Sequence, residues 1–129
     1  MAGKTKSRDA REAGFARRRK MFGPAGAEPA MEAASDFKRP LEEVVTDFCF
    51  GTIWERDGLD DRTRSMITIA VLTALGRAPQ LKNHVRGAIA NGVTKEEIRE
   101  VILHTLVYAG LPFGVEATLV AEETLSQMS

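Results

Sequence analysis

Apolar residues between positions 59 and 110 recur at helical spacing, and glycine, proline and capping residues divide them into three helices. The first predicted helix, residues 62–75, is apolar on almost every side after its first turn. A surface helix needs an apolar stripe only about 100° wide, so this helix is expected to lie centrally or at a subunit interface. Asp60 and Asp61 are placed to cap its start, and Gly76 ends it.

Two more helices follow, and both have clear end signals. One runs from Pro79 to Asn91 and ends before Gly92, with His84 inside its apolar arc. The other opens on a capping box at 94–97 and ends at Gly110. The apolar arc of the first consists of Leu81, Val85, Ala88 and Ile89, and the predicted inner stripe of the second consists of Ile98, Val101, Ile102, Thr105, Tyr108 and Ala109.

The flanking segments also predict helices. A helix from Asp9 to Phe22 is weakened by Gly14, and residues 1–14 are expected to form a flexible basic arm. After a loop at 23–29, Ser35 and Asp36 cap a helix that ends near Gly51, and the last helix begins at Pro112. The helix that follows Asp36 has one apolar stripe, formed by Leu41, Val44, Val45, Phe48 and Cys49.

No segment shows sustained alternation of apolar and polar residues, so the predicted class is all-α. A chain of 129 residues suits one domain, here a compact bundle of about six helices over residues 15–129. If helix 62–75 is not covered within the domain, its apolar surface is expected to lie at an interface of a homo-oligomer.

The charges balance to a formal net charge of zero, but they are unevenly distributed. Residues 1–20 contain eight Lys/Arg and two acids, a net charge of +6, which leaves −6 for the remainder. The basic run 17–20 suggests nucleic-acid binding or an import signal, or else a solvated face or contacts with the acidic remainder. We favour the latter interpretation and expect no nucleic-acid partner, because no recognition fold or interleaved aromatic residue accompanies the run.

Cysteine and histidine are too few for several kinds of site. Cys49 is the single cysteine, which excludes an internal disulfide, and with two histidines a protein-held metal is not expected. The first residues lack the apolar core of a signal peptide, and the longest apolar run, 66–75, is too short to span a bilayer. We therefore expect a cytoplasmic protein with no membrane partner.

Several titratable residues are candidates for chemistry. His84 is either a satisfied core residue or a catalytic group, since the ordinary pKa of imidazole suits proton transfer near neutral pH. His104 has Glu100 one turn before it and Tyr108 one turn after, which permits a carboxylate–imidazole pair or an exposed pair of no consequence. Arginines on or beside the central helices suit a small polyanionic acid, because guanidinium groups bind carboxylates in bidentate fashion. They are Arg62, Arg64, Arg77 and Arg86.

The segments FGTIWERDGLDDRTRS (50–65), ALGR (74–77), HVRGAIANGVTKEEIREVILH (84–104) and YAGLP (108–112) together resemble the carboxymuconolactone decarboxylases over roughly residues 15–126. The resemblance implies a helical bundle shared with the alkyl hydroperoxidase D-like proteins and assembled as trimers or hexamers. Members with peroxidase activity carry a cysteine pair before the histidine, where this chain has Arg77 and Gln80. Thiol peroxidase activity is therefore not expected.

The same resemblance implies a lyase without a cofactor that converts 4-carboxymuconolactone to the 3-oxoadipate enol-lactone in aromatic-acid breakdown. It makes His84 the candidate general acid or oxyanion donor, and Trp54 a candidate wall of the substrate site. The candidate anchors for the substrate carboxylate are Arg64, Arg77 and Arg86. Thr52 stands where these decarboxylases often carry an acid, and Glu55 is a candidate to compensate.

Two alternatives stay open, because a shared fold does not fix a substrate. One is another cofactor-independent decarboxylase or lactone-processing enzyme on the same scaffold. The other is a non-catalytic oligomer that binds a small acid or a partner protein.

Overall fold

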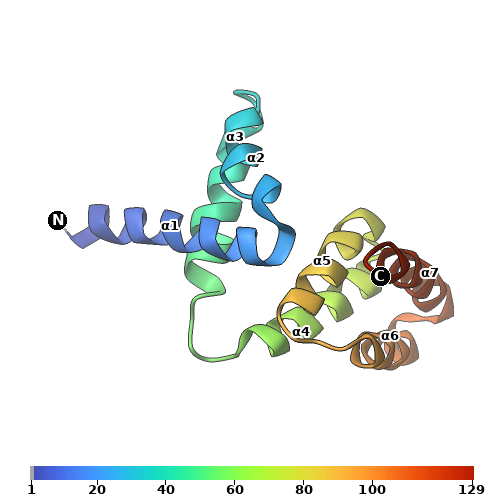
Figure 1. Ribbon diagram of the computed structural model, residues 1–129. Coiled ribbons are helices and arrows are strands. Elements are labelled where there is room, and N and C mark those ends of the chain that lie inside the picture. Colours follow the sequence, from blue (N-terminus) through green and yellow to red (C-terminus); the bar gives the residue numbers. More distant parts are fainter. Residues whose placement is uncertain (1) are drawn as a thin grey trace. The chain divides into compact units, whose positions relative to one another are not determined.

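The computed structural model describes the backbone of residues 2–129 and the side chains of residues 9–129. In this part of the chain every regular element is a helix, which confirms the all-α prediction (Figure 1). The elements form two compact units, residues 1–59 and 60–129. The prediction of one domain over residues 15–129 stays a prediction.

The first unit contains more helix than predicted. Its elements are α1 (Ala2–Phe22), a 3₁₀ turn η1 (Pro24–Gly26), α2 (Glu28–Ala33), α3 (Arg39–Glu43) and a π-helix η2 (Val44–Ile53). α1 begins at Ala2 rather than at Asp9, so it overlaps the predicted flexible arm of residues 1–14. The side chains of residues 1–8 lie outside the described residues, and the flexibility of this arm stays a prediction.

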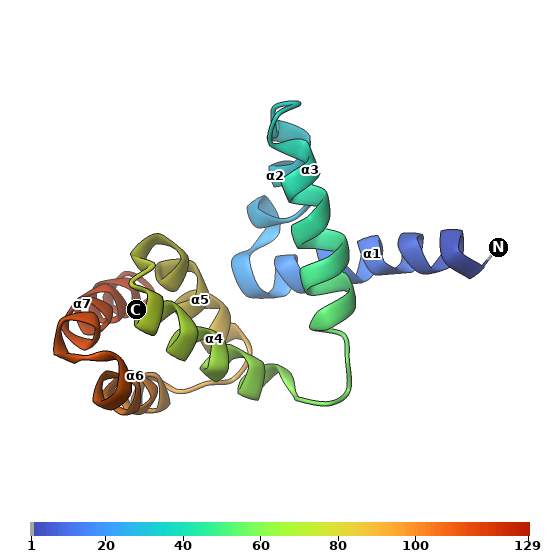
Figure 2. The ribbon, with the colours of Figure 1, turned by 180° about the vertical axis from the view of Figure 1, so that it is seen from behind.

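Helix α1 crosses η2 at a point where two glycines remove side chains from the contact (Figures 1 and 2). A Cβ atom on Gly14 would lie 1.9 Å from the carbonyl oxygen of Thr46, and one on Gly51 would lie 2.0 Å from the carbonyl oxygen of Ala10. Gly14 weakens α1 as an isolated helix, but in the folded unit it allows the two backbones to touch.

The stripe predicted after Asp36 does not face the interior of this unit. Leu41, Val44 and Phe48 are 58%, 53% and 56% exposed, whereas Glu42, Thr46 and Phe50 are buried. The wider turn of the π-helix changes which residues share a face, so a stripe drawn at 3.6 residues per turn loses register. The predicted capping site was also wrong: Ser35 Oγ accepts from the Lys38 amide at 3.2 Å, but the helix begins only at Arg39.

The basic run of α1 contacts acidic residues of its own unit. Arg11 binds both carboxylate oxygens of Asp47, at 2.8 and 2.9 Å, and Arg19 binds Glu28 at 2.6 Å. Arg17 binds Glu55, and Arg18 binds Glu42 at 2.8 Å. The interpretation of the run 17–20 as contacts with the acidic remainder is confirmed for Arg17, Arg18 and Arg19.

Arg18 and Glu42 form a buried ion pair that we expect to stabilise this unit. They are 8% and 6% exposed, and Arg18 Nη1 also donates to Thr46 Oγ1 at 2.9 Å. Burial raises the pKa of Glu42, but the hydrogen bond and charge of Arg18, with Lys38, outweigh burial and hold it below its usual value. The contribution of Glu42 to stability is therefore present above its unfolded pKa and is lost as pH falls through the folded pKa.

Arg18→Ala should lower the free energy of unfolding by about 3 kcal/mol, because it leaves a buried carboxylate without its counter-charge. Arg19→Ala is the matched control: it removes the same charge from the same helix, but its ion pair with Glu28 is largely exposed. The control should cost less than about 1 kcal/mol. Urea unfolding followed by circular dichroism measures both, and equal losses would contradict the expectation.

The second unit contains four helices that begin and end close to the predicted residues. They are α4 (Asp61–Leu75), α5 (Ala78–Ala90), α6 (Lys95–Ala109) and α7 (Leu111–Gln127). Asp60 accepts from the Thr63 amide at 2.7 Å, and Gly76 ends α4 in the left-handed region at φ 68°. The capping box between Thr94 and Glu97 is present. These local predictions are confirmed.

Helix α4 packs against the other three helices of this unit, as α7 does, and the choice between a central position and a subunit interface for α4 stays a prediction. The core comprises Ile69, Leu81, Val85, Ala88, Val93, Ile98, Ile102, Ala117 and Ala121. Several apolar residues of α4 and α6 remain exposed, and we call them the exposed α4–α6 side chains: Ile67, Val71, Leu75, Leu103, Val107 and Tyr108. Tyr108 is 80% exposed, so its placement on the inner stripe of α6 was wrong.

The lengths and compositions of the described helices show whether any of them could span a membrane. None of those in residues 2–129 combines the length and the apolar character needed to cross a bilayer. Figure 2 shows the same helices from behind, with the short α2 and α3 in the first unit and α4–α7 in the second.

Candidate functional site

His84 lies partly buried on α5, between residues that belong to the core. Burial lowers the pKa of His84 from 6.5 to about 4. The imidazole is therefore neutral at neutral pH, with one N–H donor and one acceptor nitrogen. Of the two roles predicted for His84, donation of a hydrogen bond to an oxyanion suits this state better than proton donation by an imidazolium.

The lowered pKa of His84 predicts a pH dependence of stability. The folded pKa lies below the unfolded value, so the unfolded chain takes up the proton first as pH falls below about 6.5. As pH falls from about 7.5 to about 5, the protonation of His84 in the unfolded chain should lower the free energy of unfolding by about 2 kcal/mol. Urea unfolding of the wild type and His84→Gln at both pH values measures this. An identical loss in both proteins would contradict it.

The three candidate anchoring arginines differ in how they lie relative to His84. Arg77 is the N-cap of α5, two turns before His84, so both lie on the same side of this helix about 10 Å apart along its axis. Arg86 lies on the other side of α5 and donates to Gln127 Oε1 at 3.2 Å. Arg64 lies partly buried on the neighbouring helix α4. Of the three candidates, Arg77 is therefore the one best aligned with His84.

Trp54 and Glu55 lie in the first unit, directly after η2. The Trp54 ring packs on Phe50 with centroids 5.6 Å apart, and the Arg17 guanidinium lies 5.9 Å from its centroid. Glu55 forms an ion pair with Arg17. Glu55 therefore pairs with a cation of its own unit, and its role as a replacement for an acid at position 52 stays a prediction.

The Thr52 side chain forms a hydrogen bond across one turn of the π-helix η2. Its hydroxyl donates to the carbonyl oxygen of Asp47 at 2.8 Å, five residues earlier. In this chain the side chain at position 52 therefore supports the backbone of η2.

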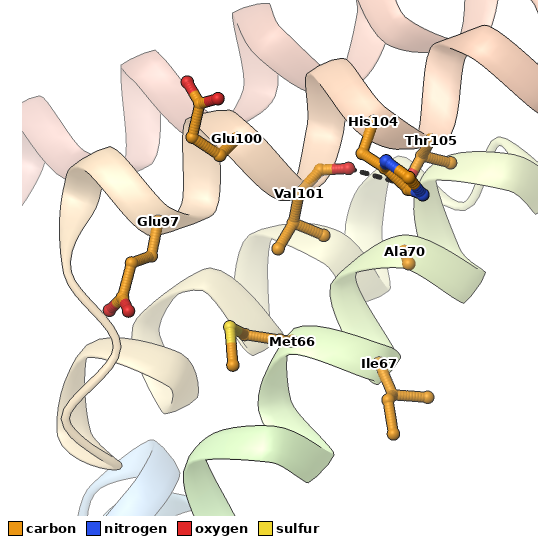
Figure 3. A pocket seen from close by; sticks show the side chains of 8 residues that line it. All are labelled: Met66, Ile67, Ala70, Glu97, Glu100, Val101, His104 and Thr105. Carbon is orange, nitrogen blue, oxygen red and sulfur yellow. Dashed lines mark hydrogen bonds between the residues drawn. The ribbon is translucent and has the colours of Figure 1, made fainter.

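A pocket of about 510 Å³ lies between α4 and α6 and brings together two of the secondary candidates, Glu100 and His104 (Figure 3). Glu100 lies 3.5 Å from Arg99, and the His104 ring packs on Tyr108 with centroids 5.4 Å apart. Figure 3 shows the Glu100 carboxylate directed away from the His104 ring. The other lining residues are Met66, Ile67, Ala70, Glu97, Val101 and Thr105.

Two carboxylates in this lining make the pocket a poor match for a dianionic substrate. Glu97 accepts hydrogen bonds from Arg62 and from the Thr94 amide, which lower its pKa to about 2. Glu97 is therefore ionised at neutral pH, although Arg62 offsets its charge. Across residues 9–129, no group of three or more His, Cys, Asp or Glu side chains is placed to hold a metal ion.

The contacts that sequence reasoning missed are between distant residues. Nothing in the sequence around apolar lining residues such as Met66 and Val101 distinguishes them from residues of the core. Arg17 and Trp54 belong to two different helical segments, so their contact could not be predicted from either segment alone. The basic run 17–20 was the feature of the sequence that drew attention to Arg17.

Residues 39–123 match the model of the Carboxymuconolactone decarboxylase family. The chain belongs to this family. The matched range includes all the candidate residues from Thr52 to His104, and α1 with Arg17 lies before it.

Members of the carboxymuconolactone decarboxylase family with related sequences act on different substrates. The chain is 40% identical over 111 residues to the 4-carboxymuconolactone decarboxylase of Acinetobacter baylyi, covering 86% of this chain and 83% of that protein. It is also 40% identical over 111 residues to the nitrosuccinic acid decarboxylase of Metarhizium robertsii, covering 86% and 78%. An uncharacterized 15.0 kDa protein of Paracoccus denitrificans is 33% identical over 108 residues, covering 82% and 81%. The first two relatives are decarboxylases, that is, carboxy-lyases.

Proposed function

We propose that this protein is a carboxy-lyase that removes CO2 from a small acid with two carboxylates, and that its substrate is 4-carboxymuconolactone. The observation that carries the proposal is the 40% identity, over 86% of the chain, to a decarboxylase of that lactone. Its place would then be in aromatic-acid breakdown, in the cytoplasm. Nitrosuccinic acid is the second candidate substrate, favoured by an equal identity to its decarboxylase.

The two candidate substrates share the chemistry that such a site must support. In each, the breaking C–C bond leaves its electron pair on a carbon conjugated to an acceptor, the unsaturated lactone carbonyl or the nitro group. The charge moves onto oxygen as a dienolate or a nitronate, and a proton then adds at carbon. In each, a second carboxylate takes no part and is available to be held. A site that holds one carboxylate and stabilises an oxyanion suits both.

His84 is the proposed oxyanion donor, and Arg77 is the proposed carboxylate anchor. A neutral imidazole in a partly desolvated position donates its N–H with little competition from water, which strengthens the bond to a developing negative charge. Arg77 offers a guanidinium on the same side of α5 as His84. The departing carboxylate leaves more readily where water is excluded.

A CO2-release assay on the two candidate substrates tests this function. We expect turnover of 4-carboxymuconolactone, with a lower kcat/KM for 2-nitrosuccinate, and the reverse order would assign the second substrate. Loss of the lactone without CO2 would indicate a lactone-processing enzyme, and binding of either acid without turnover would indicate a non-catalytic protein.

Arg77→Ala should raise KM more than Arg86→Ala, because Arg86 is held by Gln127.

We further propose that the chain self-associates as a trimer or hexamer through the exposed α4–α6 side chains. Apolar residues of this size at adjacent helices are typical of surfaces that a partner covers. The double variant Val71→Lys, Val107→Lys should therefore shift the protein to monomers in light scattering after size exclusion. Ser126→Lys, on an exposed polar position of α7, is the control and should leave the mass unchanged. An unchanged oligomer in the double variant would contradict this surface.

A further inference from the structure

Arg17 on α1 contacts two consecutive residues at the end of η2. Its guanidinium carbon lies 5.9 Å from the centroid of the Trp54 ring, and its Nη2 forms an ion pair with Glu55. The Arg17 side chain is only 13% exposed, whereas the Arg11 and Arg19 side chains of the same helix are 39% and 44% exposed. A cation over an aromatic ring is attracted by the negative ring face, and the attraction grows as water is removed.

Trp54 lies at the point where the π-helix ends and a connection made of turns and a bend begins. Its backbone amide donates to the Cys49 carbonyl at 3.0 Å, and its ring leans on Phe50. Phe50 in turn meets Phe22 of α1 edge to face, with centroids 5.6 Å apart. Trp54 is thus held by a backbone hydrogen bond to Cys49 and by the packing of its ring on Phe50. Arg17 adds a cationic contact to the same ring from α1.

We propose that Arg17 is a positioning residue that holds the Trp54 ring, with Glu55 holding the guanidinium in place. The consequence for the substrate rests on the proposed function and on the prediction that Trp54 is a wall of the substrate site. Arg17 itself is not a substrate anchor, because Glu55 neutralises its charge and the indole covers it. Loss of Arg17 should therefore weaken substrate binding and leave the chemical step almost unchanged.

The experiment uses the fluorescence of Trp54, the single tryptophan of the chain. Arg17→Ala should shift the emission maximum to longer wavelength and increase quenching by acrylamide, because the ring gains contact with water. KM should rise by about threefold to tenfold while kcat stays within about twofold, the effect expected for one cation–π contact. Arg17→Lys should restore most of both signals, because an ammonium group still pairs with Glu55 and attracts the ring.

Arg19→Ala is the matched control, since it removes a neighbouring cation whose partner is Glu28. It should leave the emission, the quenching and KM as in the wild type. Glu55→Gln should give a partial shift, because the guanidinium stays over the ring but loses its ion pair. If Arg17→Ala loses helical signal in circular dichroism, Glu55→Gln provides the comparison with Arg19→Ala, because its partial shift is expected without loss of the Arg17 side chain.

Emission and quenching in Arg17→Ala equal to those of Arg19→Ala would overturn the proposal. So would a shifted emission with an unchanged KM in the active enzyme. If the wild type releases CO2 from neither substrate, the proposed function fails. The fluorescence comparison then decides by itself whether Arg17 holds Trp54.

Discussion

His84→Gln is expected to lower kcat for CO2 release by about 10²–10³-fold, with a smaller change in KM. The substitution keeps a polar side chain of similar size, but the flexible glutamine side chain does not hold its N–H as firmly as the rigid ring does. If the neutral imidazole stabilises charge that exists only in the transition state, its loss appears in kcat and kcat/KM together. Because burial keeps His84 neutral to about pH 4, the effect should be the same at pH 6 and pH 8.

Lys82→Gln provides the control for this experiment, since residue 82 is exposed on another side of α5. It should leave kcat within about twofold of the wild type. A His84→Gln protein with the full rate would remove His84 from the mechanism. A large loss in His104→Gln instead would move the reaction to the pocket between α4 and α6.

Gly51→Ala is expected to lower the free energy of unfolding of the first unit by about 3 kcal/mol, and Gly14→Ala by a similar amount. At an ordinary helical site this change stabilises a protein by about 1 kcal/mol, because alanine is the better helix former. Here the added methyl groups would lie 2.0 and 1.9 Å from backbone oxygens, which have no rotamer that would relieve the contact. The steric cost therefore exceeds the gain in helix propensity, and α1 must shift away from η2.

Gly58→Ala is the matched control, because a Cβ at position 58 meets no atom within 4 Å. It should change the unfolding free energy by less than about 0.5 kcal/mol. Trp54 lies in the first unit, so its fluorescence during urea unfolding follows the unit in question. Equal stability of the Gly51→Ala and Gly58→Ala proteins would show that the crossing tolerates a side chain.

The helices of the second unit could be predicted because their end signals are local. Asp60 and Thr94 cap with their own side chains, and Gly76 takes a left-handed conformation that other residues avoid. In the first unit the deciding contacts are between distant residues. Gly14 reads as a weak helix position until Thr46 is placed against it, and nothing in the residues 44–53 marks a π-helix.

For the candidate site, sequence reasoning found residues but not their partners. His84 was singled out by the apolar arc around it, and the same arc explains its lowered pKa. The pairing of Glu55 with Arg17 depends on how α1 packs, so it could not be predicted from the sequence. The predicted pairing of Glu100 with His104 respects helical spacing, yet each side chain has a different neighbour.

The buried pairing of Arg18 with Glu42 sets a limit on how far the chain can be shortened from its amino end. A start placed beyond Arg18 would strand a carboxylate in an apolar interior and uncover the face of η2 that α1 protects. Recovery of soluble protein should therefore fall abruptly once the start of the chain passes Arg18.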